Sequence, residues 1–203
     1  MTKKDRISLA VILVVVAIGA LVAIAGSQGG ATIGGLPAFA LAVGAAFVIQ
    51  WLVYIHAWAK RTEKYFDLTG SLTYITITVL LVVLTPGLDA RAYLLAALVV
   101  VWAARLGTFL FRRISRAGKD DRFDELKTSF FRFLNVWTIQ GLWVTFTAAA
   151  AWVGITSSQR VEFDWLAVVG LVVWVIGFAF EVVADSQKSR FKEDPANEGR
   201  FID

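Results

Sequence analysis

The chain has 203 residues, of which 58% are hydrophobic and 18% are charged, and its formal net charge is +4. A soluble domain typically has about 45–50% apolar and about 25% charged residues, so this balance argues against an ordinary soluble protein. The chain has no Cys, which excludes disulfides, thiolate catalysis and cysteine-based metal sites.

Six apolar segments follow one another along the chain. Crossing about 30 Å of hydrocarbon takes about 20 mostly apolar residues in a helix, and the segments have that length or nearly so: 7–25, 36–58, 68–84, 92–111, 134–152 and 165–183. The first follows three cations as a signal peptide does, but its apolar run is longer than the usual signal. We predict an all-α integral membrane helical bundle of about six transmembrane helices, a single domain over 1–203 with a cytoplasmic tail at 184–203.

Most of the 20 Lys and Arg residues lie in alternate connections between these segments. They precede the first span, lie between the second and third and between the fourth and fifth, and recur in the tail. The positive-inside rule places such connections in the cytoplasm, so both termini are expected there. The same clustering beside apolar spans indicates contact with anionic lipid headgroups rather than with nucleic acid.

Small and aromatic residues within the spans predict how the helices pack. Glycine permits close approach between membrane helices, and we expect this role for Gly19, Gly44, Gly107 and Gly170. Trp143 lies deep in the fifth span, so it is expected to pack between helices.

Polar side chains inside hydrocarbon are costly and often mark function. Gln50 and Gln140 are expected to form hydrogen bonds between helices. His56, the single His, either acts as a proton donor or only reaches the water at the cytoplasmic end, and the second interpretation is favoured. Arg105 either extends to the interface or binds a carboxylate or phosphate in an internal cavity. A lone His without Cys argues against a transition-metal site.

Two hydrophilic stretches on the expected cytoplasmic side carry charges of both signs. Residues 118–127 form either a solvated linker whose salt bridges each contribute little, or a polar lid with fixed ion pairs beside an anionic ligand. Residues 181–201 should begin as a helix that Pro195 ends, with Asp185, Lys188 and Lys192 on one face. A basic tail of this kind anchors a protein to lipid or clamps the phosphates of a dinucleotide, and the spacing alone favours the anchor.

Motifs in the second half of the chain resemble those of a known family. The tail reads Ala184-Asp185-Ser-Gln187-Lys188-Ser-Arg-Phe191-Lys192 and then Pro195-Ala-Asn197-Glu-Gly199-Arg200-Phe201-Ile202-Asp203. Earlier marks are Asp67-Leu-Thr69-Gly70-Ser71, Trp102-Ala-Ala-Arg105-Leu-Gly107 and Lys119-Asp120-Asp121-Arg122-Phe123-Asp124. Over roughly residues 60 to 203 the chain resembles an uncharacterised bacterial membrane family of the steroid 5-alpha-reductase-like (C-terminal domain) superfamily.

This resemblance implies a reductase in a bacterial inner (plasma) membrane that uses NADPH to reduce a conjugated carbon–carbon double bond in a lipid-like or steroid-like substrate. An acid near the substrate carbonyl would stabilise the developing enolate. Asp67 is the candidate acid matched by motif, and Tyr54 and His56 are weaker candidates. The residues implied around the cofactor are Arg105, Asp121, Arg122, Asp185, Gln187, Lys188, Lys192, Asn197 and Arg200.

The family pattern continues past the segment that matches Phe201-Ile202-Asp203, into a Gly-Leu-Trp stretch and a His-Pro-Asn-type motif that carries much of its cofactor site. The chain ends at Asp203, so we expect either a fragment or a degenerate member of the family. Two alternatives stay open: a non-catalytic membrane protein, and a membrane methyltransferase of the same superfamily that uses S-adenosylmethionine. A transporter is disfavoured, because the sequence shows neither an inverted repeat nor a matching pair of broken helices.

Overall fold

The computed structural model describes residues 1–197 and residue 200. It divides into two compact units, Met1–Val161 and Glu162–Asp203. The first unit contains α1 (Lys3–Gly26), β1 (Thr32–Ile33), β2 (Leu36–Pro37), α2 (Ala38–Lys60), α3 (Phe66–Leu84), α4 (Ala90–Ala117), two short 3₁₀ helices η1 (Asp121–Phe123) and η2 (Leu126–Thr128), and α5 (Phe130–Thr156). The second unit contains α6 (Trp165–Glu193) and the 3₁₀ helix η3 (Pro195–Asn197).

Six of the helices are long and apolar enough to cross a membrane. This confirms the predicted all-α membrane bundle and its six spans. Several helices extend beyond the predicted spans. The spans were predicted from apolar residues alone, whereas a helix can continue through polar residues until a residue such as glycine or proline ends it. Thus α4 continues to Ala117 and ends at Gly118, whose φ of +80° favours glycine, and α6 continues to Glu193 before Pro195.

Helix α2 begins two residues after the predicted start of the second span at residue 36. Leu36 and Pro37 form the second strand of a small antiparallel hairpin with Thr32 and Ile33, and α2 begins at Ala38. The two-residue turn needs positive φ at both of its positions, which Gly34 and Gly35 supply with +59° and +82°.

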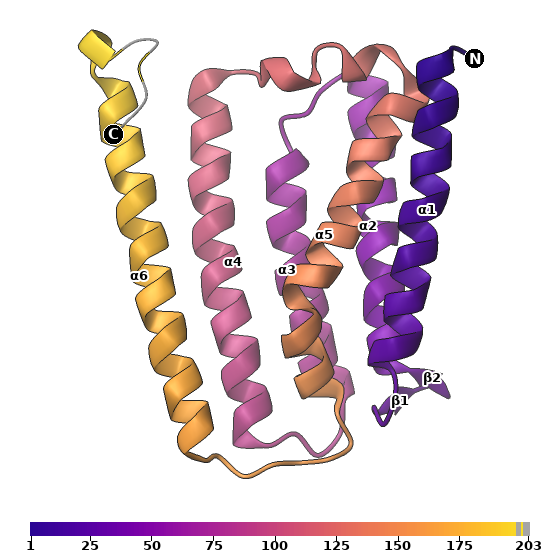
Figure 1. Ribbon diagram of the computed structural model, residues 1–203, viewed down its shortest axis with the longest axis vertical. Coiled ribbons are helices and arrows are strands. Elements are labelled where there is room, and N and C mark those ends of the chain that lie inside the picture. Colours follow the sequence, from indigo (N-terminus) through magenta and orange to yellow (C-terminus); the bar gives the residue numbers. More distant parts are fainter. Residues whose placement is uncertain (198–199, 201–203) are drawn as a thin grey trace. The chain divides into compact units, whose positions relative to one another are not determined.

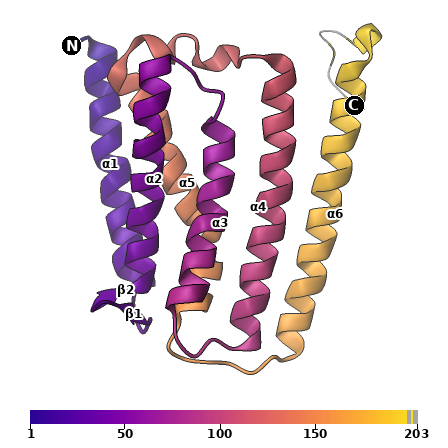
Figure 2. The same ribbon diagram turned by 180° about the vertical axis from the view of Figure 1, so that it is seen from behind.

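Helix α5 organises the first unit by crossing the other four helices (Figures 1 and 2). It contacts α1, α2, α3 and α4, while these four pack in sequence order, each against the next. The apolar core of the crossing includes the fully buried side chains of Phe39, Trp152 and Ile155. Because α5 contacts all four other helices of the unit, its buried side chains form the centre of the core.

Hydrogen bonds between buried polar side chains tie α3 to its neighbours. Gln50 of α2 donates from Nε2 to Thr73 Oγ1 at 3.0 Å, and Trp152 of α5 donates from Nε1 to Thr78 Oγ1 at 2.9 Å. The predicted interhelical role of Gln50 is therefore confirmed. In a membrane these bonds satisfy polar groups that lipid cannot.

Of the four glycines expected at close helix contacts, Gly19 and Gly107 are at such contacts, Gly44 is not, and a Cβ added at Gly170 of α6 meets nothing within 4 Å in its own unit. A Cβ added at Gly19 would lie 2.6 Å from the ring of Phe47, and one at Gly107 would lie 2.6 Å from Ser71 Cβ. A Cβ at Gly44 would meet nothing within 4 Å. Gly107 therefore sets the distance between α3 and α4, whereas Gly44 has no such role.

We expect Gly107→Ala to destabilise the bundle by about 1–3 kcal/mol, as overpacking does. The added methyl would overlap Ser71 Cβ, which is fixed to the backbone of α3. The overlap can be relieved only if α3 and α4 move apart. The measurement is the melting midpoint of the detergent-purified protein. Gly44→Ala is the matched control and should leave the midpoint unchanged or raise it, because alanine favours helix. Adding Ser71→Gly to Gly107→Ala should recover most of the loss, and no recovery would contradict the contact.

The basic connections of the first unit lie at one end of its helices (Figure 1). The N-terminus and the α2–α3 and α4–α5 connections are at this end, and the β-hairpin and the α3–α4 connection are at the other. The positive-inside rule predicts that the first end is cytoplasmic. Because the chain has no Cys, Thr32→Cys and Lys64→Cys each introduce a single thiol at an exposed position on opposite ends. An impermeant maleimide applied to intact cells should label only the first, and labelling of both would contradict the orientation.

Candidate functional site

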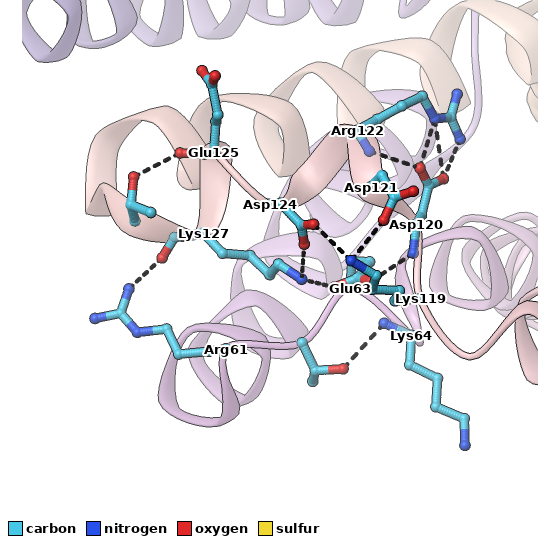
Figure 3. A network of polar contacts seen from close by, with 12 residues as sticks. Arg61, Glu63, Lys64, Lys119, Asp120, Asp121, Arg122, Asp124, Glu125 and Lys127 are labelled. Carbon is cyan, nitrogen blue, oxygen red and sulfur yellow. Dashed lines mark hydrogen bonds and ion pairs between the residues drawn. The ribbon is translucent and has the colours of Figure 1, made fainter.

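The α4–α5 loop (residues 118–129) is fixed to the α2–α3 connection by one buried carboxylate (Figure 3). Glu63 has only 5% of its side chain exposed. One of its oxygens accepts the backbone N–H of Asp120 at 2.9 Å, and the other accepts Lys127 Nζ at 2.7 Å. A buried carboxylate with one cationic and one backbone donor is well satisfied, so Glu63 holds both ends of the polar loop.

Further ion pairs extend across the loop. Lys127 also contacts Asp124 at 3.2 Å, and Lys119 contacts Asp124 at 3.0 Å and Asp121 at 2.8 Å. The guanidinium of Arg122 donates to both carboxylate oxygens of Asp120. Both predicted alternatives for this stretch include ion pairs, and Lys119, Asp121 and Arg122 are exposed in theirs, so the ion pairs do not decide between a solvated linker and a lid. Whether the loop covers an anionic ligand stays a prediction.

These contacts shift the pKa values of the loop carboxyls. Hydrogen bonds from Lys119 and Lys127 lower the pKa of Asp124, and the Arg122 guanidinium lowers the pKa of Asp120. In turn, hydrogen bonds to Asp121 and Asp124 raise the pKa of Lys119. The charged forms of these three side chains are favoured in every case.

We expect acid to loosen this loop. A carboxyl whose folded pKa is depressed contributes stability above its unfolded pKa, and the contribution is lost as pH falls through the lower folded value. For Asp120 and Asp124 the loss should therefore occur below their ordinary pKa of 3.8. Melting midpoints measured from pH 7 to pH 3 should fall steeply only at the acid end. Asp120→Asn with Asp124→Asn should flatten that fall, and an unchanged acid limb would contradict the assignment.

Beneath the loop, aromatic rings join α2, α3, η1 and α5. The ring centroids of Phe66 and Phe123 are 5.0 Å apart, and those of Phe66 and Trp137 are 5.1 Å apart. Phe133 and Trp137 are fully buried in this cluster. Edge-to-face packing of this kind fixes Phe123, and with it the position of Arg122 next to it in η1.

A cavity of about 410 Å³ lies between α3, α5 and the α4–α5 loop. Three polar side chains from distant parts of the sequence line it: Asp67 from the start of α3, Arg122 from η1 and Gln140 from α5. The rest of its wall is apolar and comprises Phe66, Phe123, Leu126, Val136, Ile139 and Trp143. This cavity thus combines one charged and polar end with an aromatic and aliphatic wall, which suits an amphiphilic small molecule.

The polar groups of the cavity are held by their neighbours. Asp67 is 28% exposed and accepts from Arg113 Nη2 of α4 at 3.2 Å. Gln140 donates from Nε2 to the Phe66 carbonyl at 3.1 Å, which confirms the predicted bond between α5 and α3. Its Oε1 is buried and finds no hydrogen-bond partner among the residues that the structure describes. Gln140 can lie this close to α3 because Gly70 has no Cβ, which would be 2.7 Å from Gln140 Nε2.

Trp143 does not pack between helices as predicted. Its side chain is 69% exposed on α5, where it forms part of the wall of the cavity. The sequence places it deep in a span, but the face of α5 that buries the core is defined by Trp137, Val144 and Trp152. A tryptophan exposed at the edge of a cavity offers an apolar contact surface to a ligand.

The other two candidate acids lie elsewhere in the first unit. Tyr54 is 3% exposed, and its hydroxyl donates to the backbone carbonyl of Phe130 at 2.9 Å. His56 lies on the exposed face of α2, with its ring 6.1 Å from that of Tyr65. Of the three candidates, Asp67 lines the cavity with Arg122.

The predicted cofactor residues of the first unit are dispersed. Arg122 lines the cavity, whereas Asp121 is 81% exposed and paired with Lys119. Arg105 lies half-buried on α4, with its guanidinium 5.3 Å from the ring of Phe109. The structure therefore brings Asp67 and Arg122 together, and it does not place Asp121 or Arg105 in the same cavity.

The remaining predicted cofactor residues belong to the second unit. Asp185, Gln187, Lys188 and Lys192 lie on α6, which ends before Pro195 as predicted. Asn197 lies in η3 and donates from Nδ2 to the Phe191 carbonyl at 3.1 Å, and Arg200 is exposed. Gly199 and the motif residues Phe201, Ile202 and Asp203 lie outside the described residues.

Sequence reasoning missed Glu63 and the cavity role of Gln140. Glu63 is the single acidic residue in a short connection that also carries Arg61 and Lys64, and an isolated carboxylate among cations is a signal that could have been used. Arg61 contributes as well, since its Nη1 donates to the Lys127 carbonyl at 2.5 Å and its guanidinium stacks 3.4 Å from the centroid of Trp58.

Comparison with known families identifies one match. A family described as "Protein of unknown function (DUF1295)" matches residues 51–203. The chain belongs to this family. The match includes both the cavity of the first unit and the tail of the second, and the DUF1295 description states no reaction. No curated protein and no solved structure matches the chain significantly.

Proposed function

We propose that this DUF1295 protein is a membrane-embedded, NADPH-dependent reductase of a conjugated carbon–carbon double bond in a lipophilic substrate. The observation that supports this most is the cavity at the end of α3 and α5. It places a carboxyl group, a guanidinium and an amide at one end of an otherwise apolar wall. An enone attached to a hydrocarbon skeleton has the matching distribution of polar and apolar surface.

The cavity residues suit the charge that such a reduction develops. When bound, NADPH supplies a hydride to the β-carbon of the enone, and negative charge appears on the carbonyl oxygen. A guanidinium fixed beside the cavity stabilises that oxyanion without reorganisation, which is the role we assign to Arg122. Asp67 is the group in the cavity that can carry a transferable proton, and we assign it the protonation that completes the saturated product. Gln140 Oε1 is buried and unpaired, so it can accept a hydrogen bond from a hydroxyl group elsewhere on the substrate.

The basic side chains of the second unit suit the cofactor. NADPH differs from NADH by a 2′-phosphate, and Lys and Arg are the groups that bind phosphate. Lys188, Lys192 and Arg200 are exposed, so their charges can reach a ligand. Asp185 and Asn197 are candidates for hydrogen bonds to the ribose and the amide. The chemistry of this donor set suits NADPH.

The apolar wall indicates the class of substrate. Ile139 and Trp143 are 40% and 69% exposed beside the cavity on a helix that spans the membrane. A molecule dissolved in the bilayer can therefore contact the wall before its polar end reaches Asp67. Sterols, polyprenoids and long unsaturated acyl chains all have this form.

The test is enone-dependent oxidation of NADPH by the full chain in lipid nanodiscs. The probes are a 3-oxo-4-ene steroid and trans-2-dodecenal, with the corresponding saturated ketone and aldehyde as blanks. We expect oxidation with at least one probe, formation of the saturated product and slower oxidation with NADH. Transfer of a methyl group from S-adenosylmethionine to a carboxylate acceptor, with no NADPH oxidation, would contradict the proposal and favour the methyltransferase alternative.

A further inference from the structure

Two further cavities lie on the first unit, lined by other residues than the cavity of Asp67. One is a groove of about 430 Å³ between α1, α2 and α5, lined by aromatic and aliphatic side chains that include Ile12, Trp51, Ile55 and Leu134. The other is a recess of about 770 Å³ formed by the first residues of α1 and the start of α5. Phe130 lines both, so the two cavities adjoin.

The recess is basic. Lys3, Lys4 and Arg132 line it, together with one carboxylate, Asp5. Both carboxylate oxygens of Asp5 already accept hydrogen bonds, one from Ser129 Oγ at 2.5 Å and the other from the backbone N–H of Thr2 at 2.8 Å. Arg132 is 3.3 Å from the exposed Glu125, and no ion pair of Lys3 or Lys4 is found among the described residues. The recess therefore presents cationic side chains to an anion from the solvent side.

The groove lacks the polar groups that a reaction needs. Tyr54 forms part of its wall, but its hydroxyl group already donates a hydrogen bond to the backbone carbonyl of Phe130. Ile55 is 64% exposed along the groove, on a helix that spans the membrane. An apolar groove on the membrane-spanning part of the unit suits a hydrocarbon chain rather than a reacting carbonyl.

We propose that these adjoining cavities bind one anionic phospholipid, with its phosphate in the recess of Lys3, Lys4 and Arg132 and an acyl chain in the groove of Ile12, Ile55 and Leu134. Charge complementarity selects an anionic headgroup. The shared residue Phe130 sets the junction between headgroup and chain. The first residues of α1 and the start of α5, which line the recess, lie at the end of the first unit that carries the basic connections. The anionic leaflet is expected at this end. The site is separate from the proposed catalytic cavity and does not depend on it.

The test compares lipids by their effect on the melting midpoint of the delipidated protein in a neutral detergent. The probes are phosphatidylglycerol, phosphatidylcholine with the same acyl chains, and inorganic phosphate. Binding of a ligand to the folded state raises the midpoint by mass action. We expect a large rise with phosphatidylglycerol, a smaller one with phosphatidylcholine and none with phosphate alone. Equal rises with the two lipids, or a rise with phosphate equal to that with phosphatidylglycerol, would overturn the proposal.

Two pairs of variants locate the effect. Lys3→Gln with Lys4→Gln should weaken phosphatidylglycerol binding by roughly 10- to 30-fold, since each basic residue near an anionic surface contributes about fivefold. Lys60→Gln with Lys64→Gln removes the same charge from the same end outside the recess, and should weaken it far less. Ile55→Trp fills the groove and should reduce binding of both lipids, whereas Leu21→Trp, exposed at the other end of α1, should not. Equal effects within either pair, or a dimer of the chain that buries the groove in delipidated samples, would overturn the assignment.

Discussion

Glu63→Gln should lower the free energy of unfolding of the first unit by about 2–3 kcal/mol. Breaking a buried ion pair by removing one partner costs about 3–5 kcal/mol, and Lys127 retains part of its compensation because Asp124 is 3.2 Å away. The neutral amide also accepts the Asp120 N–H less strongly than the carboxylate does. The melting midpoint in detergent, together with protease cleavage within residues 118–129, measures the effect.

Glu125→Gln is the matched control for this change. Glu125 also belongs to the α4–α5 loop and also forms an ion pair, with Arg132 at 3.3 Å, but its side chain is 81% exposed. Exposed pairs contribute about 0–1 kcal/mol, so the midpoint should hardly move. If Glu63→Gln and Glu125→Gln behave alike, then Glu63 does not hold the loop, and the position of Arg122 beside the cavity needs another explanation.

Asp67→Asn should reduce turnover of an active enone probe by about 10²–10⁴-fold, the range typical of a lost general acid. The amide has nearly the same shape as the carboxyl but cannot deliver a proton. Because the loss is in proton transfer, it should appear in kcat more than in KM. The measurement is the initial rate of NADPH oxidation in nanodiscs, with the melting midpoint recorded for every variant.

A structural role for Asp67 predicts a different pattern. Asp67 also holds Arg113 at 3.2 Å, so Arg113→Gln removes the same ion pair and leaves the carboxyl in place. Under the proposed role Arg113→Gln retains most of the turnover, and Asp67→Glu restores part of it. Equal losses in Asp67→Asn and Arg113→Gln, with equal falls in stability, would show that Asp67 only supports the helix packing.

The sequence determines the spans more clearly than the site, for a physical reason. Each span is a local run of apolar residues whose length must match the membrane, so α1 to α6 could be predicted one at a time. The hydrogen-bonding role of Gln50 and Gln140 could be predicted too, because an amide inside hydrocarbon must find a partner wherever that partner lies.

The cavity could not be predicted, because no local pattern encodes it. It forms only when α5 crosses α3 and when Phe123 of the loop packs on Phe66. Asp67 was predicted from a motif, but its proximity to Gln140 depends on the missing Cβ of Gly70. Glu63 is one charged residue in a charged connection, and only the packing of the loop distinguishes it from its exposed neighbours.

The ends of the helices could not be predicted from the hydropathy pattern either. Residues 112–117 of α4 and 184–193 of α6 are helical although they are polar, because capping and termination are set by Gly118 and Pro195 rather than by hydrophobicity. In consequence Asp185, Lys188 and Lys192 lie on the same continuous helix as the sixth span, and Lys188 and Lys192 are candidates for binding a phosphate.

Thermal stability of the purified full chain against NADPH tests the proposed function most directly. A cofactor at about 100 times its Kd stabilises a folded protein by about 2.7 kcal/mol. We predict a rise in the melting midpoint that saturates below millimolar NADPH, is smaller with NADH and is reduced by Lys188→Gln with Lys192→Gln. A midpoint that is unchanged at millimolar NADPH, or that rises with S-adenosylmethionine instead, would contradict the reductase.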